Sequence, residues 1–242
     1  MSLKDLLEYR RSVRVYDNEK PIDTDKVRDC LELATLAPNS SNLQLWEFIH
    51  ITDKSYKDAI TDACLGQTAA STADQWVVFV TRQDLHRKRA QFVLNFEKGN
   101  IDRNSPVARK AKRIAVRETY YGKLMPFLYS RCFRLMGAFR WLLVTVMGWF
   151  RPVVREVTET HMRGVAHKSC ALAAQTFMLA MAEKGYDTCP MEGFDSRRVK
   201  QLLNLPSSAK INMIISCGIR KGNEGIWGER CRVPFDEVYK RI

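Results

Sequence analysis

The chain has 242 residues, of which 45% are hydrophobic and 27% are charged. This length and composition supply enough apolar side chains for a packed core and exclude a disordered protein. The formal net charge of +12 is concentrated, because residues 82–168 hold 19 Lys and Arg against 6 Asp and Glu, a balance of +13. Such a block can attract anionic lipid, an anionic substrate or nucleic acid, or it can be a solvated helical face, and we expect no nucleic-acid partner.

The seven cysteines include no C-x-x-C pair, and the four histidines are too dispersed to share one helical face. We therefore expect neither a metal site nor a dithiol redox motif, and we expect most cysteines to be reduced and buried. The first residues lack the apolar run of a signal peptide, and Ser2 with Asp5 indicates a helix start. From these features we expect a cytoplasmic protein.

An arginine cluster follows the first predicted helix, which covers residues 2–9. Arg10, Arg11 and Arg14 place three guanidinium groups within five residues. Because like charges repel at this spacing, the cluster indicates that an anion or carboxylates lie between them, and the planar guanidinium group suits a phosphate. The segment is therefore a candidate anion site.

A polar loop follows the second predicted helix, which has Asp23 or Thr24 as its cap and ends at Pro38. The small polar residues after Pro38 form local hydrogen bonds to the backbone in turns, and residues 45–52 have the pattern of a strand. This arrangement predicts that a rigid frame presents the polar loop, residues 38–42.

A central strand is predicted over residues 75–81, because this stretch is almost continuously apolar. Before it, Asp53 can cap a helix that runs to Cys64, with Gly66 as its stop. Gln67 follows this glycine, and the residues alone indicate a solvated side chain there.

Basic and aromatic residues dominate the block from 83 to 165. The pattern predicts two polar helices, 83–98 and 105–122, and then apolar segments. The uncharged run 141–150 has 10 residues. A helix needs about 20 apolar residues to cross a bilayer, so we expect no membrane span.

Three interpretations of the segment 124–151 remain open: an apolar lid over a site, a helix pair at a dimer interface, or a helix lying on an anionic membrane. Arg131 and Arg134 share one helical face, but Arg140 falls on nearly the opposite face, so the clean polar stripe of a membrane-surface helix is absent. We therefore favour the lid or the interface. The aromatic side chains that could form the walls of a lid, or could pack in an ordinary core, are Phe127, Phe133, Phe139 and Trp141.

An alanine-rich helix is predicted over residues 167–184, where small side chains permit close packing. A strand over 186–189 then leads into the turn 190–193. Because glycine lets another group approach the backbone, this turn can offer bare amides to a ligand, or it can be an ordinary turn before a helix that Asp195 caps.

The last core strand is predicted over residues 211–217. The tail after this strand has a G-x-x-G-x-x-G spacing, but without a preceding strand and a following helix this is not a dinucleotide-binding fingerprint. Arg230 and Arg232 lie two positions apart, so an extended segment would place both on one face. On its own, this pair indicates solvated arginines.

In combination, these motifs resemble the FMN-dependent nitroreductase family. Residues 10–14 match the pattern R-[RH]-S-x-R, and residues 37–46 match A-P-S-S-x-N-x-Q-P-W, except that Asn39 replaces Ser and Leu45 replaces Pro. The remaining matches are the turn 190–193 and the [KR]-x-R pair at 230–232. The motifs appear in the family's order along nearly the whole chain.

The resemblance implies an α+β fold in which helices flank a mixed central β-sheet. It implies a single nitroreductase-like domain over residues 1–242, with 83–165 as a basic and aromatic helical insertion that forms a lid or an interface. It also implies an intertwined homodimer with two FMN sites at the interface, where residues 38–42 of one chain reach the flavin of the other.

The resemblance further implies which residues bind the cofactor. The FMN phosphate would be held by Arg10, Arg230 and Arg232. The flavin ring would be contacted by Arg14 at its N1 and O2 edge, by Gln67, and at N5 by an amide of Glu192 or Gly193. The full set of implied cofactor-binding residues is Arg10, Arg11, Ser12, Arg14, Pro38, Asn39, Ser40, Asn42, Gln67, Pro190, Met191, Glu192, Gly193, Arg230 and Arg232.

The activity that the resemblance implies is the passage of hydride from NAD(P)H, through FMN, to a nitroaromatic, quinone or enone acceptor by a ping-pong mechanism. No catalytic side chain is expected, because the flavin carries the chemistry. Two alternatives stay open: reductive dehalogenation or dehydrogenation on the same flavin fold, and a non-enzymatic basic protein that docks on a membrane or on nucleic acid.

Overall fold

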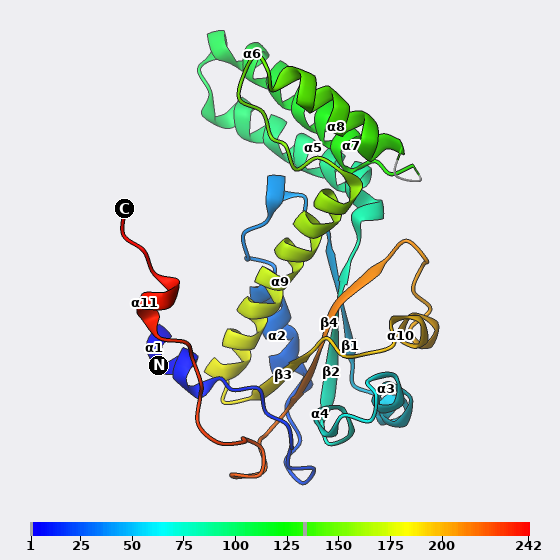
Figure 1. Cartoon of the computed structure of the whole chain (residues 1–242), viewed down its shortest axis with the longest axis vertical. Helices are drawn as coiled ribbons and strands as arrows, with labels where there is room; N and C mark the ends of the chain where they lie inside the picture. The colour runs from blue at the N-terminus through cyan, green and yellow to red at the C-terminus, as the bar shows by residue number, and fades with distance from the viewer. Residues whose placement is uncertain (1, 133–134) are drawn as a thin grey trace.

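Four strands form the central sheet of the computed structural model, which describes residues 2–132 and 135–242 (Figure 1). Neighbouring strands all pair antiparallel, and the parallel component of the expected mixed sheet is, within the described residues, one isolated bridge between Ser12 and Thr188. The predicted α+β class is confirmed. In order across the sheet, the strands are β1 (Trp46–Ile51), β2 (Gln75–Thr81), β4 (Lys210–Gly218) and β3 (Asp187–Met191).

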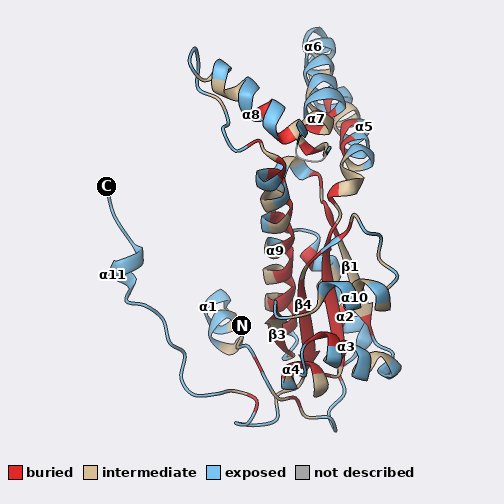
Figure 2. Cartoon of the chain, turned by 45° about the vertical axis from the view of Figure 1, so that its right-hand side comes forward, coloured by how far each residue is buried: buried red, intermediate tan, exposed pale blue. Residues whose placement is uncertain are grey.

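Helices cover both faces of this sheet and form a separate lobe at one end of the molecule (Figures 1 and 2). The helices are α1 (Leu3–Tyr9), α2 (Thr24–Ala34), α3 (Lys57–Ala63), α4 (Thr68–Ser71), α5 (His86–Asn104), α6 (Val107–Arg117), α7 (Met125–Tyr129), α8 (Leu135–Met147), α9 (Glu159–Glu183), α10 (Ser196–Leu202) and α11 (Phe235–Val238). Short 3-10 segments are η1 (Ser40–Asn42), η2 (Lys54–Tyr56) and η3 (Gln83–Leu85), and η4 (Glu118–Leu124) is a π-helix.

β2 is buried along its whole length, as its continuous apolar pattern predicts. It lies between β1 and β4, and its side chains alternate between the two faces of the sheet. Val77 and Phe79 join a core that includes Phe177 of α9. Trp76 and Val78 join the core on the other face, which α3, α4 and α10 cover. The two cores fix the sheet between α2 with α9 on one side and the shorter helices on the other.

Local capping signals set the starts of α1, α2 and α10 where the sequence places them. Ser2 and Asp5 form a capping box on α1, and the carboxylates of Asp23 and Asp195 cap α2 and α10. The long helix differs, because α9 begins eight residues before the predicted start at 167. The Thr158 side chain caps it by accepting a hydrogen bond from the His161 amide.

The basic block forms the helical lobe of α5 to α8, above one end of the sheet (Figure 1). Tyr121, Met125 and Tyr129 of this lobe share a buried cluster with Leu43 and with Met162 of α9. The lobe is therefore anchored next to the polar loop 38–42. Phe133 and Arg134, which belong to the segment 124–151, lie outside the described residues.

Arg140 of α8 points into the lobe and is 1% exposed. Its Nε donates to the Val157 carbonyl at 2.8 Å, and its Nη1 donates to the carbonyls of Phe127 at 2.8 Å and Ser130 at 3.0 Å. Burial lowers the pKa of Arg140, and the charge of Glu159 opposes that shift. The sequence places Arg140 on nearly the opposite helical face from Arg131. In the structure this side chain is buried and holds α8 to the rest of the lobe.

Burial lowers the pKa of His50, His86 and His167 below the usual value of 6.5. The unfolded chain takes up protons near pH 6.5, whereas these buried side chains resist protonation. The stability that these neutral, buried histidines contribute is therefore fully present above about pH 6.5. The free energy of unfolding should fall as the pH drops below that value.

Thermal unfolding between about pH 7.5 and about pH 5.5 measures this dependence. The variant His50→Gln keeps a hydrogen-bonding side chain beside Gln75 and should show a weaker decline of Tm. A wild-type Tm that stays constant over the range would contradict the prediction.

Candidate functional site

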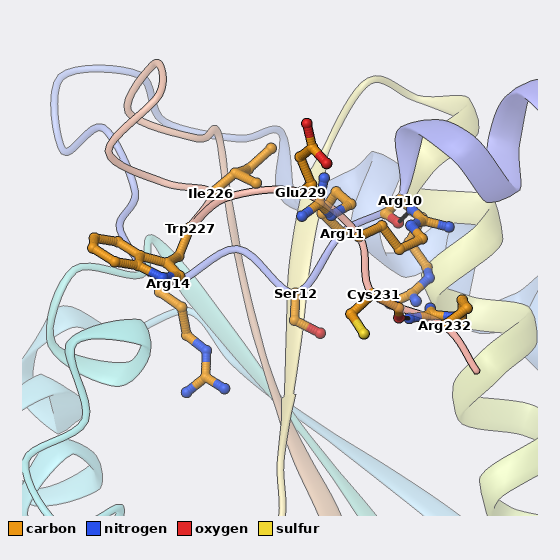
Figure 3. A pocket seen from close by; sticks show the side chains of 10 residues that line it. Arg10, Arg11, Ser12, Arg14, Ile226, Trp227, Glu229, Cys231 and Arg232 are labelled. Atoms are coloured by element: carbon orange, nitrogen blue, oxygen red, sulfur yellow. Dashed lines mark hydrogen bonds between the residues drawn. The ribbon is translucent and has the colours of Figure 1, made fainter. Parts of the chain in front are cut away.

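A pocket of about 280 Å³ lies between the segment 10–14 and the C-terminal tail (Figure 3). Arg230 lies 220 positions from Arg10 in the sequence, and the fold brings the two motifs together. The pocket is lined by Arg10, Arg11, Ser12, Arg14, Ile226, Trp227, Glu229, Arg230, Cys231 and Arg232.

The segment 10–14 is fixed along the edge strand β3. The Val13 amide donates to the Thr188 carbonyl at 3.2 Å, and the Arg14 amide donates to the Gly225 carbonyl at 2.9 Å. Val13 is fully buried, so the alternation of an extended chain turns Ser12 and Arg14 outward. Figure 3 shows Ser12 between Arg14 on one side and Arg232 on the other.

The charges of this pocket fit a phosphate. Four arginines line it besides Arg230, whereas Glu229 is the one carboxylate, and among the described residues these arginines form no ion pair. Burial lowers the pKa of Arg10, and the nearby charges of Arg230 and Arg232 lower it further. A bound anion would relieve this repulsion, and the planar donors of arginine match phosphate oxygens.

Arg230 is engaged with the protein itself. Its guanidinium donates to the carbonyls of Leu7 at 2.8 Å, Glu8 at 3.1 Å and Arg10 at 2.6 Å. The last carbonyls of a helix lack partners within the helix, so Arg230 caps α1 and ties the tail to it. This geometry favours a role for Arg230 in positioning Arg10, which the sequence pattern could not reveal.

Gln67 lies against the turn 190–193. Its Nε2 donates to the Gly193 carbonyl at 2.7 Å and to the Cys64 carbonyl at 3.0 Å. Within residues 2–132 and 135–242, the backbone amides of Glu192 and Gly193 donate to no backbone carbonyl outside the regular helices and strands. The turn follows β3, and Ser12 pairs with Thr188 of that strand, so the amides of the turn and the arginine pocket lie along one strand.

The polar loop 38–42 is held in a conformation that non-glycine residues rarely adopt. Ser41, Asn42 and Gln44 have φ values of 54°, 52° and 49°. Asn39 stabilises the loop, because its Oδ1 accepts from the Gln44 amide at 2.8 Å. Such strain persists only where the surroundings over-determine the backbone, and it occurs often at ligand sites.

The polar loop and the arginine segment contact positions far apart along α9. The Ser40 amide donates to Ser169 Oγ at 3.2 Å, whereas the Tyr9 hydroxyl beside Arg10 donates to the Gly185 carbonyl at 2.9 Å. With a helical rise of 1.5 Å per residue, these contact points are roughly 24 Å apart. One chain therefore does not bring all the implied cofactor residues together.

The helical lobe contacts the polar loop through η4. The hydroxyl groups of Tyr120 and Ser41 lie 2.8 Å apart, and the Tyr121 hydroxyl donates to the Ser41 carbonyl at 3.2 Å. π-Helical turns are rare and often lie at functional sites. Next to this contact is a cavity of about 430 Å³ with mainly apolar walls from the loop, η4, α7, α8 and α9.

Comparisons with known proteins identify the family. A sequence model described as the nitroreductase family matches residues 7–219. The chain belongs to the nitroreductase family. MhqN of Bacillus subtilis, named as a candidate NAD(P)H nitroreductase, is 24% identical over 216 residues, which cover 89% of this chain and 87% of MhqN.

Solved structures of nitroreductase-family proteins share the fold. The candidate nitroreductase ydfN of Bacillus subtilis superposes with a TM-score of 0.72 at 22% identity, over 99% of this chain and 98% of that one. A candidate nitroreductase of Exiguobacterium sibiricum in complex with FMN gives a TM-score of 0.69 at 18% identity, over 100% of this chain and 98% of that one. The predicted family and the oxidoreductase class that its description names are confirmed, and the structural neighbour from Exiguobacterium sibiricum binds FMN.

Proposed function

We propose that the arginine pocket binds the FMN phosphate, and that the enzyme uses this FMN to pass hydride from NAD(P)H to a nitroaromatic, quinone or enone acceptor. The observation that carries the proposal is the cluster of like-charged arginines beside β3, the strand that leads into the turn 190–193. When bound, FMN would supply the acceptance and donation of hydride.

Each group has a defined task in this proposal. Arg10 and Arg232 hold the phosphate, Arg11 adds positive charge, and Arg230 keeps Arg10 in place. Arg14, on the other side of Ser12, would stabilise negative charge on the flavin ring. The Glu192 or Gly193 amide would donate a hydrogen bond to the ring, and Gln67 steadies the turn that carries these amides.

NAD(P)H and the acceptor would use the same open face in succession, which gives ping-pong kinetics. The apolar cavity beside Ser40 and Ser41 is suited to the acceptor, because its mainly apolar walls match an aromatic or aliphatic molecule. In this arrangement, the helical lobe acts as the lid over that cavity.

A homodimer would complete each site. The polar loop of one chain lies too far along α9 from its own arginines, so a symmetric partner would supply it, as isologous interfaces allow. The C-terminal tail also supports an intertwined dimer, because it leaves the body of the chain with exposed apolar side chains (Figure 2). These side chains are Val233, Phe235, Val238 and Tyr239.

The absorption spectrum of the purified protein tests the proposal. We expect bands of oxidised flavin, release of FMN on denaturation, and bleaching when NADH or NADPH is added. Initial rates with a simple quinone or nitroaromatic should give parallel double-reciprocal lines. Protein that stays colourless after incubation with FMN would contradict the cofactor site, and intersecting lines would contradict the ping-pong order.

A further inference from the structure

The outer face of α8 carries a continuous apolar stripe. Positions spaced by three and four residues share one side of a helix, and in α8 and the turn after it these positions are large, apolar and solvent-exposed. Figure 2 shows α8 projecting from the end of the molecule with most of its surface exposed. The stripe consists of Leu135 (68% exposed), Phe139 (55%), Leu142 (57%), Val146 (41%), Trp149 (73%) and Phe150 (83%).

The inner face of α8 is already occupied, so the stripe cannot rotate into the core. A Cβ on Gly137 would lie 2.9 Å from the backbone nitrogen of Glu159, which shows how closely α8 approaches the start of α9. Arg140 is the one charged residue between 135 and 150, and it is buried. The exposed stripe therefore contains no charge, and Arg140 does not oppose its burial in an apolar phase.

Positive charge follows this stripe in the sequence and also lies elsewhere in the same lobe. Arg151 and Arg155 follow α8 directly and are exposed. On α6, at the same end of the molecule, Arg109, Lys112 and Arg113 line a groove (Figure 1). Among the ion pairs of the described residues, none involves these five side chains. They are therefore available to anionic groups outside the protein.

We propose that α8 binds the surface of an anionic lipid bilayer and lies in the plane of the membrane. Its 13 residues form a rod of roughly 20 Å. Of the described helices, none is long and apolar enough to cross a membrane. Exposed tryptophan and phenylalanine beside arginine is the composition that prefers the region between headgroups and acyl chains.

Charge distinguishes a bilayer from the same lobe of a second copy of the chain as the cover of this stripe. The block 82–168 carries a balance of +13, so two such lobes would repel each other on close approach. An anionic bilayer attracts the same block and buries the same apolar side chains. This proposal does not depend on the proposed reaction, because it concerns a surface outside the arginine pocket.

Flotation of the flavin-loaded protein with vesicles tests the proposal. One set of vesicles contains phosphatidylcholine alone, and the other also contains phosphatidylglycerol. We expect binding to the anionic vesicles that weakens with added salt. The double variant Leu142→Ser/Trp149→Ser should bind them at least about tenfold more weakly, because two inserted apolar side chains are lost.

The matched control is Leu65→Ser, which removes a side chain that is 70% exposed, close to the 73% of Trp149, but lies beyond the end of α3 at the other end of the molecule. This variant should bind like the wild type. Absence of binding at low salt would overturn the proposal, as would equal binding by the double variant. If the stripe instead binds a second copy of the chain, neither the wild type nor the double variant should bind vesicles. Light scattering would then show that the double variant forms a smaller assembly than the wild type.

Discussion

Replacing Arg10 by alanine is expected to weaken FMN binding about 30-fold, which corresponds to about 2 kcal/mol for lost charge-assisted hydrogen bonds. Arg10 is half-buried, and the Arg230 side chain fixes its backbone carbonyl, so a neighbouring arginine cannot easily take its place. Titration of FMN into the deflavinated protein, followed by quenching of flavin fluorescence, measures the change in Kd.

The control for this variant is Arg28→Ala. Arg28 is exposed on α2, where it pairs with Glu32, and it lies outside the pocket. Its removal should leave the Kd for FMN unchanged, so a loss of binding in Arg28→Ala would point to general electrostatic attraction. An unchanged Kd in Arg10→Ala would reject the phosphate assignment.

Mixing chains tests whether the two parts of the site come from different subunits. Arg10→Ala and Asn42→Ala are each expected to bind FMN poorly. A mixed dimer contains one site with both changes and one site with neither, so tight binding should return at one FMN per dimer. Two differently tagged chains allow that dimer to be isolated. Failure of the mixture to recover any tight site would contradict a site shared across the interface.

Removing the buried guanidinium of Arg140 is expected to cost about 3 kcal/mol in the free energy of unfolding. Arg140→Ala leaves the carbonyls of Val157, Phe127 and Ser130 without their donor in a buried region. Urea unfolding measures the loss, and limited proteolysis shows whether the lobe around α8 opens first.

Two further variants separate the causes. Arg140→Met keeps most of the side-chain volume, so any stability that it regains over Arg140→Ala reports packing, and the remaining loss reports hydrogen bonds. Arg131→Ala removes a partly exposed arginine nearby and should change stability by no more than about 0.5 kcal/mol. Equal stability of Arg140→Ala and Arg131→Ala would refute the anchoring role.

Much of the fold follows from local signals. The predicted strand 75–81 coincides with β2, because a strand buried on both faces has a continuous apolar sequence. Asp23 and Asp195 cap helices as predicted, because a cap depends on neighbouring amides only. The start of α9 differs, since Thr158 precedes a charged stretch with no apolar periodicity to mark a helix.

The direction of Arg140 could not be predicted from the sequence. α8 is apolar on nearly every side, so its periodicity does not tell which face meets the protein. The carbonyls that accept hydrogen bonds from Arg140 belong to segments before and after α8 in the sequence. Only the folded lobe brings these segments together.

The candidate site, like the fold, could be predicted from the sequence only in part. The segment 10–14 could be predicted to bind an anion from its own residues, whereas the same role for 230–232 came only from the family resemblance. The fold places both motifs on one pocket. The capping role of Arg230 depends on the orientation of α1, which no residue pattern records. Trp227 and Glu229 also line this pocket. In the sequence, only their position close to Arg230 indicated that they could lie there.

The π-helix η4 constrains how the length of this chain can vary during evolution. Surface loops tolerate the gain or loss of a residue because they do not fix the rotation of the next element. In an α-helix, one deleted residue turns every later side chain by about 100° relative to those before it, and in a π-helix the rotation is somewhat smaller. A deletion within 118–124 would therefore move Tyr120 and Tyr121 out of line with α7, and their contact with Ser41 would be lost. Homologues that keep this contact should keep the length of η4, while the loops around them vary.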